Sequence, residues 1–383
     1  MVNTTLTNPK PISQPHHTQR ESNIELLRII AMLLVMVVHA CFKSISAPTQ
    51  QEIAAAPIDS FLRFFGESAS IICVNVFVII SGWFGIKAKF SRISEFIFQV
   101  WFFGTFMYLS LLLLGLTESE GVKGWIKMFI FSDHWFVKSY IILYLFSPVL
   151  NAFILHSSQR QLAWFIIGYY CIQTLYGFYF EQGWFANGYS PLSFIGLYML
   201  ARYIRLYPLY LTQFDKWKDF LIYLCLTIAI SLIAFYLTRH DHSYWLMYAY
   251  SSPLVILSAV YFFLFFSKLS FCNSFINWVA VSCFAAYLVH MDSHFFHPYY
   301  TDIIKHWFLT VDRYTFVGNV ALLIGSIYTC AILIDKVRIV IWKCLLPGLR
   351  HIANKFSWNG NVSGNNLTKT GCKSPDSATP SGE

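Results

Sequence analysis

Long apolar stretches alternate with short polar segments along most of the chain. A helix rises about 1.5 Å per residue, so an apolar stretch of about 20 residues spans the roughly 30 Å hydrocarbon core of a bilayer. The pattern predicts about ten such helices, at residues 24–42, 67–86, 95–116, 135–155, 162–179, 191–206, 220–237, 245–267, 274–291 and 315–334. The expected fold class is therefore all-α, a polytopic integral membrane protein whose surroundings are the lipid bilayer.

The composition excludes a water-soluble globule. Only 12% of the 383 residues are charged and 56% are hydrophobic, whereas a soluble domain carries about 25% charged residues. The formal net charge of +8 does not predict nucleic acid as a partner, because the Lys and Arg residues are scattered over short connecting segments instead of forming one basic domain.

The same Lys and Arg residues predict the orientation, because short basic segments resist translocation across the membrane. With the N-terminus inside, eighteen of them fall in cytoplasmic segments and seven in outer segments. Both termini are therefore expected in the cytoplasm. The expected organisation is a disordered N-terminal segment at 1–22, a transmembrane domain at 23–345 and a disordered tail at 346–383.

The first predicted span contains three ionisable residues, Glu25, Arg28 and His39. A bilayer penalises such side chains by about 2.5 to 3.5 kcal/mol each at its centre. Arg28 and His39 are eleven residues apart, and eleven steps of about 100° return to within roughly 20° of the same azimuth. The two side chains therefore share one helical face, about 16 Å apart along the axis. Glu25 lies three residues before Arg28, close enough to pair with it.

Glu25 and Arg28 could also be anchors at the membrane interface, with side chains that reach the headgroups, and His39 could mark the outer boundary of the span. The shared azimuth favours a functional face, because a helix that faces lipid gains nothing from two aligned polar groups. We therefore expect a polar track around a central polar cavity, with Arg28 towards the cytoplasm and His39 towards the outer side.

Two further histidines fall near the outer ends of predicted spans. His134 precedes Trp135, and His290 follows Tyr287 by three residues. Three imidazoles at one depth could line one cavity and move protons near neutral pH, although the membrane interface also favours amphipathic rings. The later loop histidines have irregular spacing, so no metal site is predicted.

A compact basic segment follows the second span, with Lys87, Lys89 and Arg92. Such cations bind phosphates through charge-assisted hydrogen bonds, but positive-inside topology alone would also place them there. The sequence contains no Walker loop, no GxGxxG and no GxSxG motif. The usual signatures of ATP-driven transport and of a serine hydrolase are therefore missing.

Taken in order, these elements resemble the acyltransferase 3 family of membrane-bound acyltransferases, which modify cell-surface sugars in bacteria. The family's motif is an arginine, then ten residues of any type, then a histidine, and Arg28 and His39 match this spacing. Glu25 lies where the family commonly has an Asp. Three weaker elements also match the family's order, namely Ser81-Gly82-Trp83, His134-Trp135-Phe136 and Tyr287-Leu288-Val289-His290. The resemblance covers residues 23 to 335, and it departs from the family in the basic segment, which lacks the usual nearby proline.

The resemblance implies an O-acetyltransferase of the bacterial inner membrane. It would transfer an acetyl group from cytoplasmic acetyl-CoA to a hydroxyl of a surface polysaccharide or lipopolysaccharide O-antigen sugar. The implied catalytic residues are His39, Arg28 and Glu25. His39 would be the catalytic base or the group that briefly carries the acetyl, and Arg28, paired with Glu25, would meet the CoA phosphates. The implied CoA-binding residues are Arg28, Lys87, Lys89 and Arg92, and the implied substrate-binding residues are Ser81, His134, Trp135, Tyr287 and His290.

Three other functions remain open at this point. A transporter or flippase of a lipid-linked saccharide would use the buried Arg and His without CoA, and would commonly show an internal repeat that this sequence lacks. A glycan polymerase or glycosyltransferase would need larger outer loops than the roughly 20-residue ones expected here. A scaffold would leave the alignment of Arg28 with His39 unexplained. The sequence determines neither the sugar, nor the acyl length, nor the oligomeric state.

Overall fold

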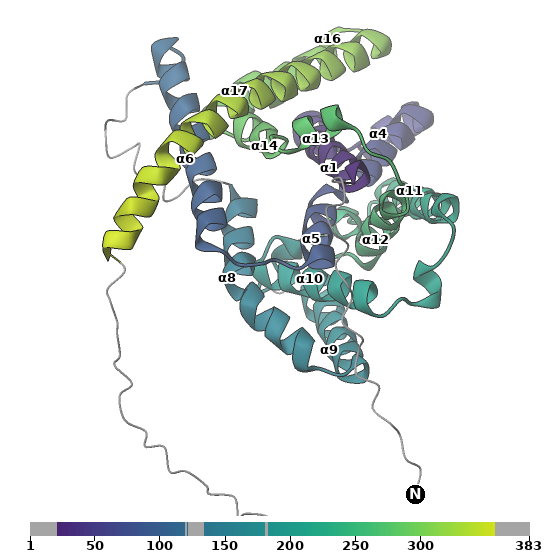
Figure 1. Ribbon diagram of the computed structural model, residues 1–383. Helices are drawn as coiled ribbons and strands as arrows, with labels where there is room; N and C mark the ends of the chain where they lie inside the picture. Colours follow the sequence, from purple (N-terminus) through teal and green to yellow (C-terminus); the bar gives the residue numbers. More distant parts are fainter. Residues whose placement is uncertain (1–20, 119–120, 122–133, 181–182, 357–383) are drawn as a thin grey trace, which may run out of the picture. The chain divides into compact units, whose positions relative to one another are not determined.

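The computed structural model describes residues 21–118, 121, 134–180 and 183–356, and within them the chain is helical and has no β-strand (Figure 1). Residues up to 339 form one compact unit, and a second unit begins at residue 340. The predicted N-terminal segment 1–22 lies almost wholly outside the described residues. The last helix continues to Phe356, past the start of the predicted tail at 346, and the rest of that tail lies outside the described residues.

Within the described residues, most connections between the α-helices are turns, short irregular segments or short 3₁₀- and π-helices. In chain order they are α1 (Ser22–Ala40), α2 (Phe42–Ile45), α3 (Gln50–Ala55), α4 (Pro57–Ser70), α5 (Cys73–Phe84), α6 (Phe90–Leu113), α8 (Trp135–His156), α9 (Gln159–Ile172), α10 (Pro191–Leu206), α11 (Lys216–Arg239), α12 (Pro253–Ser267), α13 (Ser274–Ala280), α14 (Phe284–His290), α15 (Ser293–Phe296), α16 (Asp302–Thr310) and α17 (Arg313–Phe356). Side chains that favour a helix start precede several of these helices. Ser158 and Asp215 accept hydrogen bonds from backbone N–H groups in the first turns of α9 and α11, which otherwise lack a partner.

Seven segments within the described residues are long and apolar enough to cross a membrane. They are Ser22–Ile45, Pro57–Phe84, Phe90–Leu113, Trp135–His156, Lys216–Arg239, Trp245–Ser267 and Arg313–Gly348. The protein is therefore a multi-pass, all-α membrane protein, as predicted, but the count is lower than the predicted ten.

The difference comes from three predicted spans, at 162–179, 191–206 and 274–291. The first changes from α9 to a π-helix at Gln173–Tyr179, the second is the 16-residue α10, and the third is divided into α13 and α14 by a short turn. Hydropathy marks these segments as apolar but does not reveal where packing shortens or interrupts a helix.

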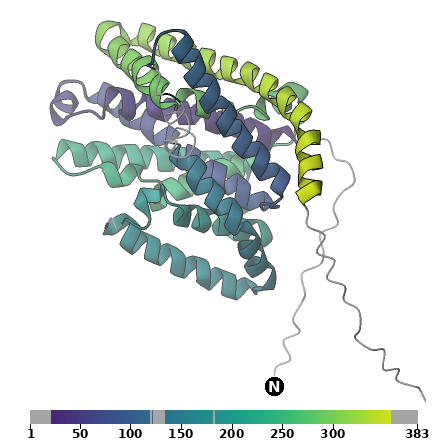
Figure 2. The same ribbon diagram turned by 90° about the vertical axis from the view of Figure 1, so that its left-hand side faces the viewer.

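α1 lies at the centre of the first unit, where it contacts α4, α5, α12, α13 and α14. Figure 1 shows it in purple beside α13, and the view in Figure 2 shows most helices of this unit running along a common direction. Both ends of α1 are fixed. The Asn23 amide donates to the carbonyl of Leu269 (2.8 Å), and the Tyr300 hydroxyl donates to the carbonyl of Met36 (2.6 Å). This helix therefore holds Arg28 and His39 in defined places.

Gly82 allows α5 and α10 to approach closely. A methyl group at this position would lie 2.5 Å from the carbonyl oxygen of Tyr198, so the contact requires glycine. The approach agrees with the role expected of small residues between membrane helices. It also sets the distance between the helices on one side of the site.

α17 contains a buried ion pair. Arg338 is only 3% exposed, and its guanidinium binds Asp335 at 2.9 Å. The Asp335 carboxylate also accepts a hydrogen bond from Gln99 of α6 (2.9 Å). Pairing offsets much of the cost of burying these charges. The predicted span ended at 334 because the hydropathy pattern alone does not reveal such a pair.

Candidate active site

Two histidines from distant parts of the chain meet at the C-terminal end of α1. His39 Nδ1 and His290 Nε2 are 3.1 Å apart. His290 is fully buried at the end of α14, and its Nδ1 lies 2.7 Å from the carbonyl oxygen of Ala286 one turn earlier. Ser44 donates a hydrogen bond to the carbonyl of His39 itself (2.6 Å), which fixes the backbone where α1 ends.

This chain of contacts determines which nitrogens carry protons when both rings are neutral. A carbonyl oxygen only accepts, so His290 Nδ1 must be the donor to Ala286. His290 Nε2 is then the acceptor, and His39 Nδ1 donates to it. The remaining nitrogen, His39 Nε2, keeps its lone pair. The arrangement therefore leaves one imidazole nitrogen ready to take a proton or to act as a nucleophile.

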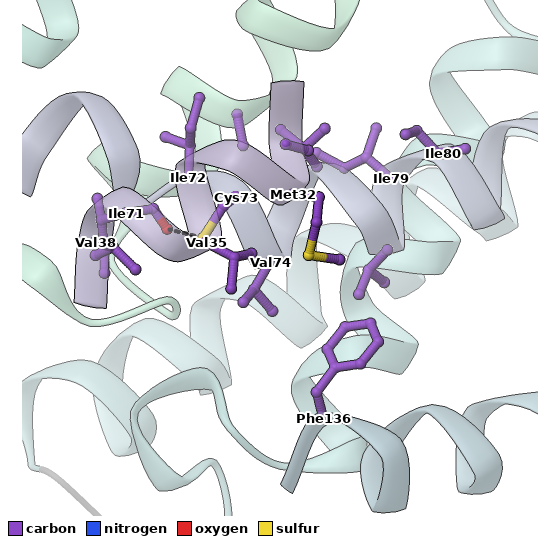
Figure 3. Packing of buried hydrophobic residues seen from close by; sticks show 14 of the residues in the cluster. Met32, Val35, Val38, Ile71, Ile72, Cys73, Val74, Ile79, Ile80 and Phe136 are labelled. Atoms are coloured by element: carbon purple, nitrogen blue, oxygen red, sulfur yellow. Dashed lines mark hydrogen bonds between the residues drawn. The ribbon is translucent and has the colours of Figure 1, made fainter. Parts of the chain in front are cut away.

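A small cavity of about 20 Å³ adjoins His39; we call it the His39 chamber. Its walls are mostly apolar and include Met32 and Val35 of α1, Val74 of α5 and Phe136 of α8. Figure 3 shows Phe136 pointing from α8 towards Met32 and Val74. The chamber is therefore a place where a polar reaction would be shielded from water.

A larger cavity of about 430 Å³ is lined by Arg28; we call it the Arg28 cavity. Lys87 and Arg92 line it as well, so three cations from α1 and from the segment before and within α6 converge on one space. The Glu25 carboxylate accepts a hydrogen bond from the Arg28 guanidinium (2.7 Å), which confirms the predicted pair and orients that guanidinium. Such a set of donors suits an anion with several phosphate oxygens.

Tyr144 holds the basic segment in place. Its hydroxyl donates to the carbonyl of Lys89 (2.9 Å) and accepts from the N–H of the same residue (2.7 Å). The Lys89 side chain is exposed and does not line the Arg28 cavity. Of the three predicted cations of this segment, Lys89 thus contributes its backbone to the loop, whereas Lys87 and Arg92 contribute side chains to the cavity.

Three phenylalanines separate the two cavities. Phe77, Phe136 and Phe284 line both the Arg28 cavity and the His39 chamber. The ring centroid of Phe136 lies 6.3 Å from that of Phe77 and 6.2 Å from that of Phe284. Both Arg28 and His39 face the interior, as predicted, but the polar track expected between them is interrupted by these aromatic rings.

The other predicted site residues fall into two groups. Trp135 and Tyr287 line the His39 chamber, and the buried His134 packs against Tyr287 with ring centroids 5.4 Å apart. Ser81 instead lines the Arg28 cavity, where its hydroxyl lies 3.3 Å from that of Tyr140. It therefore lies on the Arg28 side of the three rings, and not among the residues around His39.

Sequence reasoning missed several residues that shape the site. Gln99 and Tyr140 line the Arg28 cavity, and Gln99, as a polar residue within a predicted span, carried a signal that could have been used. The sequence gives no comparable signal for Phe77 and Phe284, because an aromatic residue in an apolar helix cannot be distinguished from any other core residue.

The loop after His290 contains His294 beside Asp292. Within the residues that the structure describes, no group of three or more His, Cys, Asp or Glu side chains is placed to hold a metal ion. His294 lies 3.6 Å from the carboxylate of Asp292. Burial raises the pKa of that carboxyl, while the N–H of His294 opposes the shift.

Comparison with known proteins supports an acyltransferase. A family model described as an acyltransferase domain, that of acyltransferase 3, matches residues 21–335. Searches of curated proteins and of solved structures find no match. The matched range contains every residue of both cavities and favours an enzyme over a transporter. This chain, a membrane acyltransferase, therefore belongs to the acyltransferase 3 family.

Proposed function

We propose that the protein is an O-acetyltransferase of the bacterial inner membrane. It takes an acetyl group from acetyl-CoA on the cytoplasmic side and passes it to a hydroxyl of a surface polysaccharide or of a lipopolysaccharide O-antigen sugar. The observation that carries the proposal is that two residues of α1, Arg28 and His39, line two neighbouring cavities. Arg28 lines a cavity rich in cations, and His39 lines a separate, mostly apolar chamber. Both termini lie in the cytoplasm in this proposal.

The Arg28 cavity would hold the phosphates of CoA. Its volume of about 430 Å³ lies within the roughly 300–1,000 Å³ of small-molecule sites. The planar guanidinium of Arg28 matches pairs of phosphate oxygens, and Lys87 and Arg92 add positive charge. The thin pantetheine arm of CoA would then extend between the three phenylalanines and bring the thioester to His39.

His39 would carry out the proton transfer. The acceptor oxygen forms a bond to the thioester carbonyl carbon, its proton moves to His39 Nε2, and the carbon–sulfur bond breaks. The proton then goes to the CoA thiolate, so the step balances without a further reactant. If His39 first accepts the acetyl group itself, the same lone pair attacks the carbonyl carbon and the carbon–sulfur bond breaks. The acceptor hydroxyl then attacks the acetyl carbon, the bond to His39 Nε2 breaks, and the hydroxyl proton goes to the CoA thiolate. His134 and Trp135 would help to orient the sugar.

An assay with labelled donor tests the proposal. Membranes that contain the protein and its native saccharide are supplied with acetyl-CoA labelled in the acetyl group, and the label is expected in an ester of the saccharide. Arg28→Lys keeps the charge but loses the planar fork, so we expect the KM for acetyl-CoA to rise by about 10-fold, with a smaller change in kcat. Arg160→Lys, at the exposed start of α9, is the matched control.

One result would contradict the proposed reaction, and another would contradict the role of Arg28. Label that reaches no saccharide would exclude the proposed reaction. An unchanged KM in Arg28→Lys would leave the reaction intact but assign Arg28 a structural role.

A further inference from the structure

The side-chain amide of Gln99 has a fixed orientation at the wall of the Arg28 cavity. Gln99 lies on α6 and lines the cavity, and its Nε2 lies 2.9 Å from Asp335 Oδ1. Arg338 holds the Asp335 carboxylate by donating to both of its oxygens, at 2.9 and 3.1 Å. A carboxylate only accepts hydrogen bonds, so the nitrogen of the Gln99 amide must face it. The Gln99 oxygen is therefore the atom that is left for another partner.

This oxygen is not used by the described part of the chain. Within the residues that the structure describes, Gln99 Oε1 accepts no hydrogen bond. Gln99 is only 8% exposed, and a buried polar atom normally has a partner. The lone pairs of Oε1 are therefore available to a molecule in the cavity that brings an N–H or O–H donor.

The hydroxyl groups that line the same cavity give their protons to other groups of the protein. The Ser81 hydroxyl donates to the carbonyl of Phe77 (3.1 Å), so the 3.3 Å contact between Ser81 and Tyr140 must contain the Tyr140 proton. The Tyr144 hydroxyl donates to the carbonyl of Lys89 (2.9 Å). A ligand therefore has to accept hydrogen bonds from the cations of the cavity and bring its own donor for the oxygen acceptors.

The Gln99 acceptor lies further along α6 than the cations. Arg92, Phe96 and Gln99 are spaced by four and three residues, so they share one face of the helix, and all three line the cavity. Arg92 and Gln99 are seven residues apart, which corresponds to about 10 Å along the helix axis. A ligand with an anionic end and an N–H donor further along its length fits this arrangement.

We propose that Gln99 Oε1 accepts a hydrogen bond from an amide N–H of the pantetheine arm of the acyl donor. This arm joins the diphosphate of CoA to the sulfur of the thioester, and it contains two secondary amides, each with one N–H. The inference rests on the proposed function and deepens it, because it names the part of the donor that one side chain recognises. Asp335 is a positioning residue here, since it orients the Gln99 amide.

The test removes the N–H from the donor. Membranes with the full-length protein and its saccharide receive acetyl-CoA or one of two analogues, in which either amide N–H of the arm is replaced by an ester oxygen. The kcat/KM for formation of the acetyl ester of the saccharide is measured with each donor. Loss of one hydrogen bond lowers kcat/KM by about 10-fold, so we expect the wild type to use one of the analogues about 10-fold less well than acetyl-CoA.

The variant Gln99→Leu separates recognition from packing. It should lower kcat/KM with acetyl-CoA by about 10-fold and abolish the difference between acetyl-CoA and that analogue, because the two changes remove the same hydrogen bond. If Gln99 only supported α17, the variant would weaken the use of all three donors alike and the difference would persist.

Gln173→Leu is the matched control. Gln173 is 2% exposed, begins the π-helix after α9 and lines neither cavity. This variant also places a leucine at a buried glutamine, and it should keep the wild-type ratio between the donors.

A pantetheine arm occurs in CoA and also, as phosphopantetheine, on carrier proteins. Acetyl-phosphopantetheine, which has the arm but no nucleotide, is therefore a fourth donor. We expect it to be used at least about 10-fold less well than acetyl-CoA, because it brings fewer phosphate oxygens to the cations. Equal use would support the contact with the arm and identify a carrier protein as its source.

The remaining outcomes distinguish this inference from the proposed function. Equal kcat/KM of the wild type with acetyl-CoA and with both ester analogues would overturn the contact with Gln99 and leave the proposed transferase in place. A preference for acetyl-CoA over an analogue that persists in Gln99→Leu would do the same. Failure of the wild type to transfer acetyl from acetyl-CoA would overturn the proposed donor, and this inference with it.

Discussion

His39→Ala is expected to lower acetylation of the surface saccharide by about 1,000-fold or more, because it removes the lone pair that accepts the proton. His39 is the imidazole whose Nε2 stays unprotonated in the neutral His39–His290 pair, and it lines the chamber where the thioester would react. The measurement is mass spectrometry of the saccharide from cells that lack the gene and carry either the wild type or the variant.

The control is His240→Ala, at the exposed end of α11, which should leave acetylation unchanged. The variant protein should remain in the membrane in normal amount, since His39 is only half-buried. Full acetylation in His39→Ala would show that another group carries out the chemistry.

His290→Leu is expected to reduce kcat by roughly 100- to 10,000-fold, although His290 need not touch the substrate. It acts as a positioning residue, because its Nε2 accepts the proton of His39 Nδ1 and so keeps the lone pair on His39 Nε2. Loss of the partner that sets a histidine tautomer costs about 10⁴-fold in serine proteases. Steady-state kinetics should show the change in kcat, with the KM for acetyl-CoA nearly unchanged.

Two further variants separate positioning from packing. His290→Gln places an amide oxygen near the position of Nε2, so it should recover part of the lost rate. Phe296 also packs on His39, with ring centroids 5.4 Å apart. Phe296→Leu removes this ring contact without removing a hydrogen bond to His39, so it should have little effect on kcat. If His290→Leu and Phe296→Leu behaved alike, the tautomer account would fail.

The periodicity of the first span predicted the placement of two residues of the candidate site. A helix of 3.6 residues per turn puts residues eleven apart on one face, and the structure places Arg28 and His39 on the interior side of α1. The pair of Glu25 with Arg28 followed from the same geometry. Local spacing along one helix can be read directly from a sequence.

Contacts between distant segments could not be predicted in this way. His39 and His290 are 251 residues apart, and one sequence gives no information on which helices are neighbours. The interruption of the ninth predicted span, 274–291, has the same origin. The break between α13 and α14 directs Phe284 and His290 inwards against α1 and α6. The three rings that divide the cavities depend on such packing.

The most direct test of the account uses sealed membrane vesicles turned inside out, so that the cytoplasmic face is accessible. Acetyl-CoA labelled in the acetyl group is added outside, and esterified label is measured on saccharide enclosed in the lumen. The account predicts that label accumulates inside while CoA remains outside, and that it does not accumulate with His39→Ala. Label confined to saccharide on the accessible face, or equal label with the wild type and His39→Ala, would contradict transfer across the membrane through this site.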